Sequence, residues 1–344
     1  MARKSTTSNA TWGRKAWKNL SLQLKDYRRA LILTHAYPDP DALSSGWALA
    51  DILRRKLKIR SRLAYSGTID RPENRAMVKL LNIPCKEHTS LDYSGKPAIL
   101  MVDASPGAGN NSLGPDDRIT AVLDNHHGAS VAGLGRRLRR QCGATATMAT
   151  ELYQAARLRP TTKMATALFY GIKTDTKALG REASAADEAA YRWLFPLADH
   201  RLLARIENPR LPQYTYRMLQ RALEGTRLYD RVVVTDMGRL DGREGPATAV
   251  DLLVRLVGIE VALAHGYWNG AQVFSLRSMN PRREAWRLAR LAVGNEGSAG
   301  GHTTSAGGNI PVDSVKASIR AGYRLERRFI KAARAGKKRG RKLV

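Results

Sequence analysis

The sequence predicts an α/β protein built from two domains, and three observations support this fold class. Short, continuous apolar runs at 30–33, 98–103 and 119–124 alternate with helix-period patterns in the first half of the chain. Such runs are typical of strands covered on both faces, as in a parallel sheet. Strand patterns return after a helical, charged stretch, and 344 residues are enough for two separate cores.

The first domain is expected over residues 23–183, after a basic N-terminal arm at 1–22 that we expect to be disordered. The apolar run at 30–33 is followed by residues spaced as on one face of a helix, namely Leu43, Trp47, Ala50, Leu53 and Leu57. The pattern is helical again from 146 to 173. This order of elements predicts a parallel sheet with helical crossovers.

A helical linker is expected over 184–228, because this charged stretch has no strand pattern. Beyond it, the sequence predicts a smaller mixed α/β domain at 229–330 and a basic C-terminal tail at 331–344. The strand-like runs of the second domain are 231–237, 258–268 and 271–279. They are interleaved with helix-period segments, so this domain is mixed as well.

The composition favours a polyanionic partner. Lys and Arg number 58 against 30 acidic residues, a net charge of +28 that concentrates nucleic acids and other phosphate-rich molecules around the protein. Basic residues cluster in GRRLRR at 135–140 and in the tail. No run of about 18 apolar residues occurs, so no membrane partner is expected. Cys85 and Cys142 match no metal-binding pair, and two reduced thiols favour a cytoplasmic location.

Aspartate and histidine residues follow the predicted strands of the first domain. They are His35, Asp39 and Asp41 after the first run, Asp103 after the second, Asp124, His126 and His127 after the third, and Asp175 after the apolar ALFYGIKT. Taken singly, each has another explanation, such as a helix cap or a turn residue. Together they predict a ligand site, because parallel strands present ligands at their carboxyl ends. Converging carboxylates need a cation, and an Asp/His set without Cys suits Mn²⁺ or Mg²⁺.

Four of these segments carry a family resemblance. THAYPDPDALSS, MVDAS, LDNHHG and GIKTDT resemble, in this order, the motifs of the DHH phosphoesterases. FSLRSM and GSAGGHTTSAGG resemble the DHH-associated C-terminal domain, so the resemblance covers about residues 25–325. It implies a parallel-sheet catalytic domain joined by the linker to a substrate-binding domain. The layout is most similar to bacterial nanoRNases and pAp phosphatases.

The resemblance implies two divalent ions, with Mn²⁺ favoured and Mg²⁺ as the alternative. The implied ligands are His35, Asp39 and Asp103 for one ion and Asp41, Asp103, His126 and Asp175 for the other. His127 would then contact the scissile phosphate. The family has Asp directly before the His pair, whereas Asn125 stands there in this chain and Asp124 lies one place earlier. Asp124 is therefore expected only to hold a ligating imidazole in the right tautomer.

The glycine-rich segment at 297–308 is expected to form a loop that binds substrate. Glycines let backbone N–H groups approach a phosphate, and consecutive N–H groups can form an anion-binding nest. Arg277 is the expected phosphate fork, because a guanidinium can bind two oxygens at once. Ser278 on the same strand, and Gly300, Gly301 and His302 in the loop, complete the expected substrate-binding set. The alternative for the loop is a flexible linker.

The leading hypothesis is a two-metal phosphoesterase that hydrolyses short RNA or DNA oligonucleotides, pAp, or both. The alternative enzymes are a cyclic or linear dinucleotide phosphodiesterase and a single-strand exonuclease, the latter favoured by the positive charge. A nucleic-acid-binding protein without catalysis is the alternative from another class. An inorganic pyrophosphatase would share the first-domain motifs but not the C-terminal ones. A homodimer is compatible with the resemblance.

Overall fold

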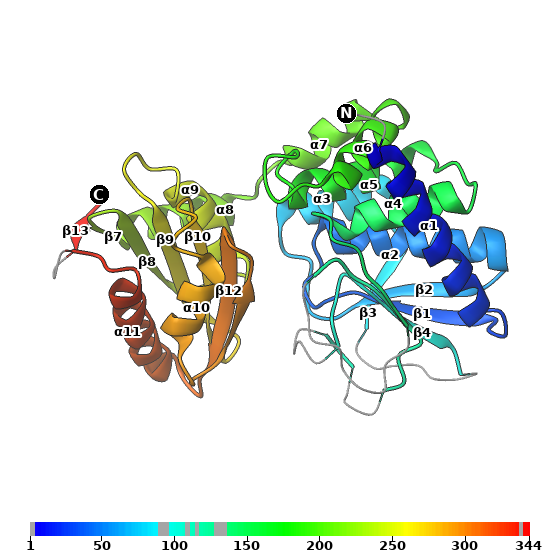
Figure 1. Ribbon diagram of the computed structural model, residues 1–344. Helices are drawn as coiled ribbons and strands as arrows, with labels where there is room; N and C mark the ends of the chain where they lie inside the picture. The colour runs from blue at the N-terminus through cyan, green and yellow to red at the C-terminus, as the bar shows by residue number, and fades with distance from the viewer. Residues whose placement is uncertain (1–3, 89–95, 107–110, 114–116, 127–135, 337–339) are drawn as a thin grey trace. The chain divides into compact units, whose positions relative to one another are not determined.

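The computed structural model describes residues 4–88, 96–106, 111–113, 117–126, 136–336 and 340–344. The chain divides into two compact units, residues 1–209 and 210–344 (Figure 1). Each unit has its own sheet and its own core. No helix within the described ranges is long and apolar enough to cross a bilayer.

The first unit contains a six-stranded sheet in the order β3-β2-β1-β4-β5-β6, and all of its pairings are parallel. Its strands are β1 (Arg29–Leu33), β2 (Arg60–Tyr65), β3 (Cys85–Glu87), β4 (Ala98–Val102), β5 (Ala121–Leu123) and β6 (Arg136–Leu138). The three apolar runs form the parallel strands β1, β4 and β5, as predicted, and these strands are neighbours in the sheet. The others are short or rich in arginine, so they lack the continuous apolar pattern of a strand buried on both faces.

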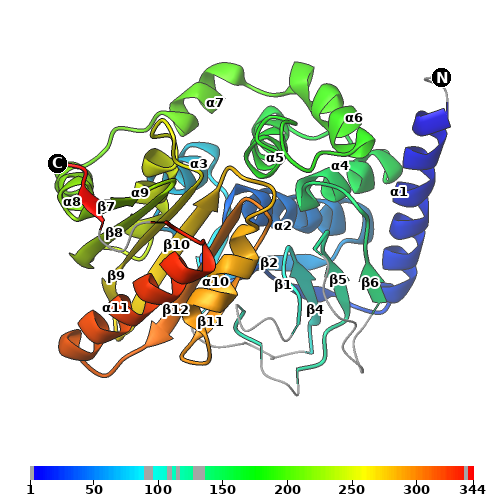
Figure 2. The ribbon, with the colours of Figure 1, turned by 60° about the vertical axis from the view of Figure 1, so that its left-hand side comes forward.

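Helices cover this sheet and make most of the first core (Figure 2). They are α1 (Lys4–Gln23), α2 (Pro40–Ile52), the π-helical turn η1 (Leu53–Leu57), α3 (Pro72–Leu81), α4 (Thr145–Ala155), α5 (Thr162–Asp175), α6 (Ala185–Leu194), the 3₁₀ turn η2 (Phe195–Leu197) and α7 (His200–Glu207). Helices α2, α4 and α5 pack against one another. Figure 2 shows them, together with α1, on the same side of the strands.

The expectation of a disordered N-terminal arm was wrong. Residues 4–23 form α1, which packs against α4, and Ala16 and Leu20 are buried in the core. The indole Nε1 of Trp12 donates a hydrogen bond to the carbonyl of Arg139 at 2.9 Å. The basic composition of this segment hid apolar residues spaced four apart, which is the period of one helix face.

The stretch at 184–228 is mostly helical, but its last residues begin the strand β7, and the division between the two units falls within it. Helices α6 and α7 belong to the first unit, and α8 (Gln213–Glu224) belongs to the second. The second unit has a seven-stranded sheet in the order β11-β12-β10-β9-β8-β7-β13, in which only the β8–β9 pair is parallel. It is therefore the predicted mixed α/β unit.

The strands of this sheet are β7 (Thr226–Tyr229), β8 (Val232–Arg239), β9 (Val261–Trp268), β10 (Ala271–Ser278), β11 (Ser298–Gly301), β12 (Ser305–Pro311) and β13 (Arg341–Lys342). One face packs against α8 and α9 (Gly245–Leu253), and the other against α10 (Ala285–Val293) and α11 (Val315–Ala332). Residues 331–344, expected as a basic tail, contain the end of α11 and the strand β13, which pairs with β7.

The glycine-rich segment is not a loop, which corrects the sequence-based expectation. Its residues form β11 and the start of β12, joined by a short turn. A Cβ atom on Gly308 would lie 2.2 Å from the carbonyl oxygen of Ser298, and Gly301 has a φ of +147°. The glycines are therefore needed where the two strands approach too closely for a side chain.

Candidate metal centre

Three neighbouring strands bring the predicted site residues together at their carboxyl ends. His35 follows β1, Asp103 follows β4, and Asp124 and His126 follow β5. Because β4 lies between β1 and β5 in the sheet, Asp103 lies between the two histidines. Its backbone has a φ of +54°, in the left-handed region that aspartate tolerates better than most residues.

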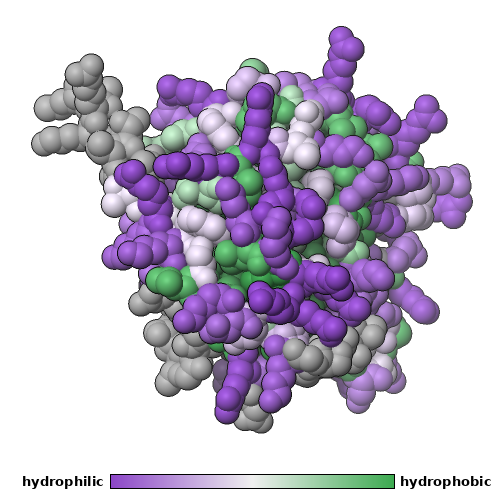
Figure 3. Space-filling view, turned by 90° about the vertical axis from the view of Figure 1, so that its right-hand side faces the viewer, coloured by the Kyte–Doolittle hydropathy of each residue, from purple (hydrophilic) through white to green (hydrophobic). Residues whose placement is uncertain are grey.

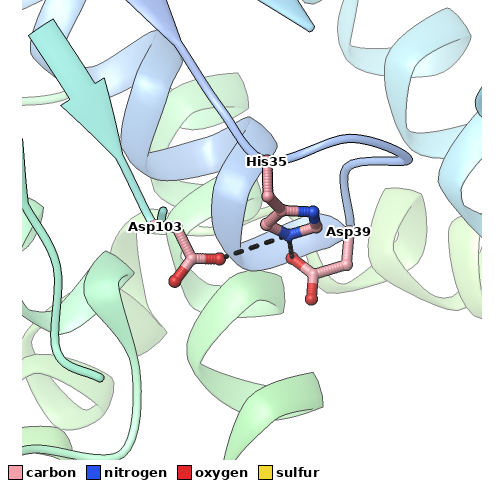
Figure 4. Close-up of side chains that lie close together, drawn as sticks. All are labelled: His35, Asp39 and Asp103. Atoms are coloured by element: carbon pink, nitrogen blue, oxygen red, sulfur yellow. Dashed lines mark ion pairs between the residues drawn. The ribbon is translucent and has the colours of Figure 1, made fainter. Parts of the chain in front are cut away.

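The first cluster consists of His35, Asp39 and Asp103, whose side chains point toward one another (Figure 4). The Nε2 atom of His35 lies 3.8 Å from Asp39 Oδ1 and 3.6 Å from Asp103 Oδ2, and both distances are too long for hydrogen bonds. Its Nδ1 atom lies 2.8 Å from the carbonyl oxygen of Ala36. With its proton on Nδ1, the imidazole would donate a hydrogen bond to that carbonyl, and the Nε2 lone pair would face the carboxylates.

The second cluster consists of Asp103, Asp124 and His126, so Asp103 belongs to both. The other carboxylate oxygen of Asp103, Oδ1, lies 3.6 Å from His126 Nδ1. That nitrogen also lies 2.8 Å from Asp124 Oδ1. Asp124 is fully buried, and its Oδ2 accepts hydrogen bonds from Ser105 Oγ at 2.6 Å and Arg137 Nη2 at 2.7 Å.

The carboxylate of Asp41 is held by the first turn of α4. Its Oδ2 accepts a hydrogen bond from the backbone N–H of Thr145 and its Oδ1 one from that of Ala146, both at 2.7 Å. The negative carboxylate suits the positive end of this helix. The structure therefore does not place the Asp41 oxygens within either cluster. Asp39 caps α2 through a 3.0 Å bond to the Ala42 N–H, with the same oxygen that faces His35.

Asp175 does not follow a strand, which corrects the sequence-based expectation. It is the last residue of α5, because the apolar residues before it are the buried face of that helix. Arg181 donates from Nε to the Asp175 backbone carbonyl at 3.1 Å, and its Nη2 lies 3.9 Å from the carboxylate. Like Asp41, Asp175 belongs to neither cluster, but its charge shifts the pKa values of residues in them.

The negative charge of the site exceeds what its histidines can balance. Burial, together with the neighbouring carboxylates, raises the pKa of Asp41 and of Asp175 well above the usual value. Burial opposes protonation of His35, yet Asp103 and Asp39 raise its pKa well above the usual value. Burial opposes ionisation of Asp39, but the neighbouring His35 lowers its pKa well below the usual value. The protons favoured on Asp41, Asp175 and His35 still indicate a site short of positive charge.

The Asp124–His126 pair has shifts of opposite sign. Burial opposes ionisation of Asp124, but the bonds from His126 and Ser105 lower its pKa to about 2. Burial likewise opposes protonation of His126, while the Asp124 hydrogen bond and the Asp103 charge raise its pKa to about 9. Asp124 is thus ionised and bonded to the His126 imidazole, which leaves its orienting role as a prediction.

Two residues near the clusters, Thr145 and Arg137, were not expected from the sequence. Thr145 Oγ1 lies 2.9 Å from Asp103 Oδ1 and 2.8 Å from Asn125 Oδ1, so its hydroxyl can donate to either oxygen. Asn125 in turn donates to the Cys142 carbonyl at 3.1 Å, which gives the residue at the departure from the family motif a neutral, hydrogen-bonded role. Arg137 belonged to the cluster GRRLRR, and its position on β6 could have been recognised only from the fold.

The remaining predicted residues, apart from His127, belong to the second unit. His127 lies outside the described residues. In the second unit, the Arg277 side chain is 14% exposed and pairs with Asp251, at 2.7 Å from Nε and 3.4 Å from Nη2. Ser278 is buried and bonds to Asn280.

The backbone N–H of Ser278 donates to the Thr304 carbonyl at 2.9 Å, so the end of β10 adjoins the turn that contains His302. Gly300 and Gly301 precede this turn and are exposed.

Comparison with known proteins identifies the fold. No family model matches the chain. The uncharacterized protein MJ1633 of Methanocaldococcus jannaschii is 31% identical over 288 residues, which are 83% of this chain and 59% of that protein, so the chain spans less than two thirds of its relative.

Two solved structures are similar across nearly the whole chain. An exopolyphosphatase-related protein from Bacteroides fragilis has a TM-score of 0.68 at 13% identity, covering 93% of this chain and 98% of that one. RecJ from Thermus thermophilus, solved with Mn²⁺, has a TM-score of 0.53 at 17% identity, covering 94% of this chain and 55% of that one. Both units of the chain therefore have counterparts in known folds.

Proposed function

We propose, from the premise that this chain has the fold of the DHH phosphoesterases, that it is a two-metal hydrolase of phosphate esters. The observation that carries the proposal is the position of Asp103. One of its oxygens faces the His35 imidazole and the other faces the His126 imidazole, each at 3.6 Å. A carboxylate with this geometry can be shared by two ions.

The residues fit divalent cations. Two ligand atoms about 2.1 Å from one ion lie about 3.0 Å apart in octahedral and about 3.4 Å apart in tetrahedral coordination. The separations of 3.6 and 3.8 Å in the first cluster are close to these values, and they exceed hydrogen-bond length. The donor set of carboxylates and imidazoles suits Mn²⁺ or Mg²⁺. RecJ was solved with Mn²⁺, which supports testing that ion first.

We propose that His35, Asp39 and Asp103 hold one ion and that Asp103 and His126 hold the other, with Asp41 and Asp175 as the further ligands. Asp41 can bind an ion only if its carboxylate gives up at least one of the hydrogen bonds from the Thr145 and Ala146 N–H groups. Bound divalent ions supply Lewis-acid stabilisation of phosphoryl oxygens and lower the pKa of a water. The chain orients His35, because the Ala36 carbonyl bonds its Nδ1 and leaves Nε2 for the ion. Asp124 bonds Nδ1 of His126, the same nitrogen that faces Asp103, so His126 would bind the ion through Nε2.

For the substrate, we propose short RNA or DNA oligonucleotides, or a small nucleotide such as pAp. Arg277, Ser278 and the Gly300–His302 segment are the proposed contacts to its phosphate, and His127 is the proposed contact at the scissile phosphoryl group. Arg277 would have to exchange Asp251 for a phosphate, which its planar fork can bind in the same bidentate manner. The net charge of +28 favours one second candidate, an exonuclease acting on longer single strands.

The test is a time course with end-labelled RNA and DNA of about two, five and 24 residues, with Mn²⁺, with Mg²⁺ and with chelator. Asp103→Asn tests the shared ligand, and Asn also tolerates the positive φ. Asp230→Asn is the matched control, because it removes an exposed carboxylate at another positive φ in the second unit.

Metal-dependent loss of the dimer and pentamer, abolished only by Asp103→Asn, is the expected result. Faster attack on the 24-mer would favour the exonuclease. If no oligonucleotide, pAp or cyclic dinucleotide were hydrolysed, a binding protein without catalysis would become the better description.

A further inference from the structure

A cluster of exposed basic side chains lies at the amino ends of the strands of the first sheet, the end opposite His35 and Asp103. We call it the amino-end basic surface. Its members are Lys25, Arg28, Arg29, Lys58, Arg60, Lys96 and Arg118. Figure 3 views the molecule from the side on which β1 and β2 begin, and it shows a face crowded with hydrophilic side chains.

The sheet register places these residues next to one another. Arg29 at the start of β1 pairs in register with Arg60 at the start of β2, and the Arg60 N–H donates to the Arg28 carbonyl at 3.0 Å. Neighbouring strands lie about 4.8 Å apart, so these backbones adjoin directly. On the other side of β1, Ala98 of β4 pairs with Ala30, which brings Lys96 to the same edge.

The end of α1 lies next to the start of β5 and adds cations to this surface. The side-chain amide of Gln23 donates to the Thr120 carbonyl at 2.5 Å, which fixes the turn after α1 next to the entry of β5. Lys25 lies two residues beyond Gln23, and Arg118 lies two residues before Thr120. Helix α1, β1, β2, β4 and β5, with the residues that adjoin them, therefore each contribute at least one cation to one continuous edge.

Acidic residues do not neutralise this surface. Asp26 and Asp117 are the acids beside it, against seven cations. Within the described ranges, none of the seven forms an ion pair, whereas other cations of this unit do: Arg55 pairs with Asp51 and Arg137 with Asp124. Like charges side by side on adjacent strands are unfavourable for folding. An anionic partner would remove that repulsion.

We propose that the amino-end basic surface binds the phosphate backbone of a nucleic acid longer than the short oligonucleotides proposed above as substrates. The five residues of β1 separate this edge from His35 by about 16 Å of extended chain, so the phosphates bound here are not those at the metal centre. The contact is made by cations to phosphates and does not read sequence. It holds the enzyme on a long nucleic acid and does not depend on the proposed hydrolysis.

The test is the binding of the full chain to a fluorescent 24-residue RNA in chelator, which prevents metal-dependent hydrolysis, at about 50–200 mM KCl. The surface variant carries Lys25→Gln, Arg28→Gln, Arg29→Gln and Arg60→Gln. The control variant carries Lys163→Gln, Arg201→Gln, Arg205→Gln and Arg210→Gln, which remove the same four charges from exposed positions away from this edge. Thermal unfolding verifies that both variants fold.

The surface variant is expected to lose at least tenfold in affinity at the lowest salt. Because each phosphate contact contributes about 0.7 to the slope of log K against log salt for a single strand, its slope should become shallower by about 2–3. The control variant should keep the slope of the unmodified chain. Hydrolysis of a dinucleotide should be the same in all three proteins, or equally absent if the proposed function fails.

Equal loss of affinity in both variants would mean that only net charge matters, and would overturn the proposal. So would binding to anionic phospholipid vesicles without binding to RNA, because the partner would then be a membrane. A selective loss of dinucleotide hydrolysis in the surface variant would also overturn it, since the surface would then belong to the substrate site.

Discussion

Asp124 bonds the His126 imidazole, and its replacement tests the proposal that it orients this residue. Asp124→Asn keeps the shape but removes the charge that holds the imidazole and pairs with Arg137. Outer residues that hold a metal-bound histidine contribute about 10–100-fold to affinity. We expect Mn²⁺ affinity of the His126 site to fall by that factor, while the His35 site is nearly unchanged, in a calorimetric titration.

Arg137→Gln is the companion variant for this prediction, because it removes the other charged partner of Asp124 and leaves the His126 hydrogen bond in place. It should weaken metal binding less than Asp124→Asn. Equal affinities of Asp124→Asn and the unmodified chain at both sites would contradict the orienting role.

The raised pKa of His126 makes metal binding depend on pH. In the metal-free protein, His126 has a pKa of about 9, so it is protonated at neutral pH. A metal ion needs the neutral imidazole, so binding must release that proton. The affinity is therefore highest above pH 9 and falls by up to tenfold for each pH unit below it, or about 50-fold from pH 9 to pH 7 on account of this group.

Calorimetry of Mn²⁺ binding in buffers of different ionisation enthalpy measures the number of protons released. His126→Gln should release one proton fewer at neutral pH than the unmodified chain. An affinity for Mn²⁺ that does not change between pH 7 and 9 would contradict the prediction.

At the scale of elements, α1 is a structural part of the first unit, and Gly13 lies directly against α4. A Cβ atom there would lie 2.9 Å from the Glu151 carbonyl oxygen, and that oxygen is backbone and cannot move away easily. Gly13→Ala gains about 1 kcal/mol in helix propensity but incurs about 1–3 kcal/mol of overpacking. We expect a net loss of about 1 kcal/mol in the free energy of unfolding, measured with urea.

Lys15→Ala on the exposed side of α1 serves as the control and should change the free energy of unfolding by less than about 0.5 kcal/mol. If Gly13→Ala instead stabilised the protein by its full helix propensity, α1 would not be packed on α4 in solution.

The glycine-rich hairpin shows how element type can differ from composition. Glycine disfavours strands in general, so the segment at 297–308 predicted a loop. In the structure it pairs β11 with β12, and the missing side chains allow a backbone approach that Ser298 and Gly308 illustrate. Strand propensity is overridden there by the geometry of the neighbours, which single-sequence patterns do not contain.

At the scale of the whole molecule, both charged clusters belong to the first unit. Every residue of the two clusters lies within 1–209, and so do the groups that orient them. Residues 1–209 expressed alone are expected to bind Mn²⁺ with an affinity within about threefold of the full chain, measured by calorimetry. The same fragment with Asp103→Asn should not bind. A folded fragment that binds Mn²⁺ at least tenfold more weakly would contradict this independence.

The sequence by itself determined the order of strands and helices at the centre of each unit, because continuous apolar runs and helix-period stripes report burial directly. It also placed His35, Asp103 and His126 at strand ends, since those residues directly follow such runs. The sequence did not predict three peripheral elements. The basic residues of α1 concealed its helical period, and the arginines of β2 and β6 interrupt the apolar pattern of a buried strand.

Only the tertiary structure decided which atoms meet. Sheet order placed Asp103 between two histidines, and α4, more than 100 residues further along the chain, engaged both oxygens of Asp41. Sequence spacing does not specify such long-range contacts. They depend on packing between elements and on the need of each buried polar group for a partner, and both conditions are met only when the chain is folded.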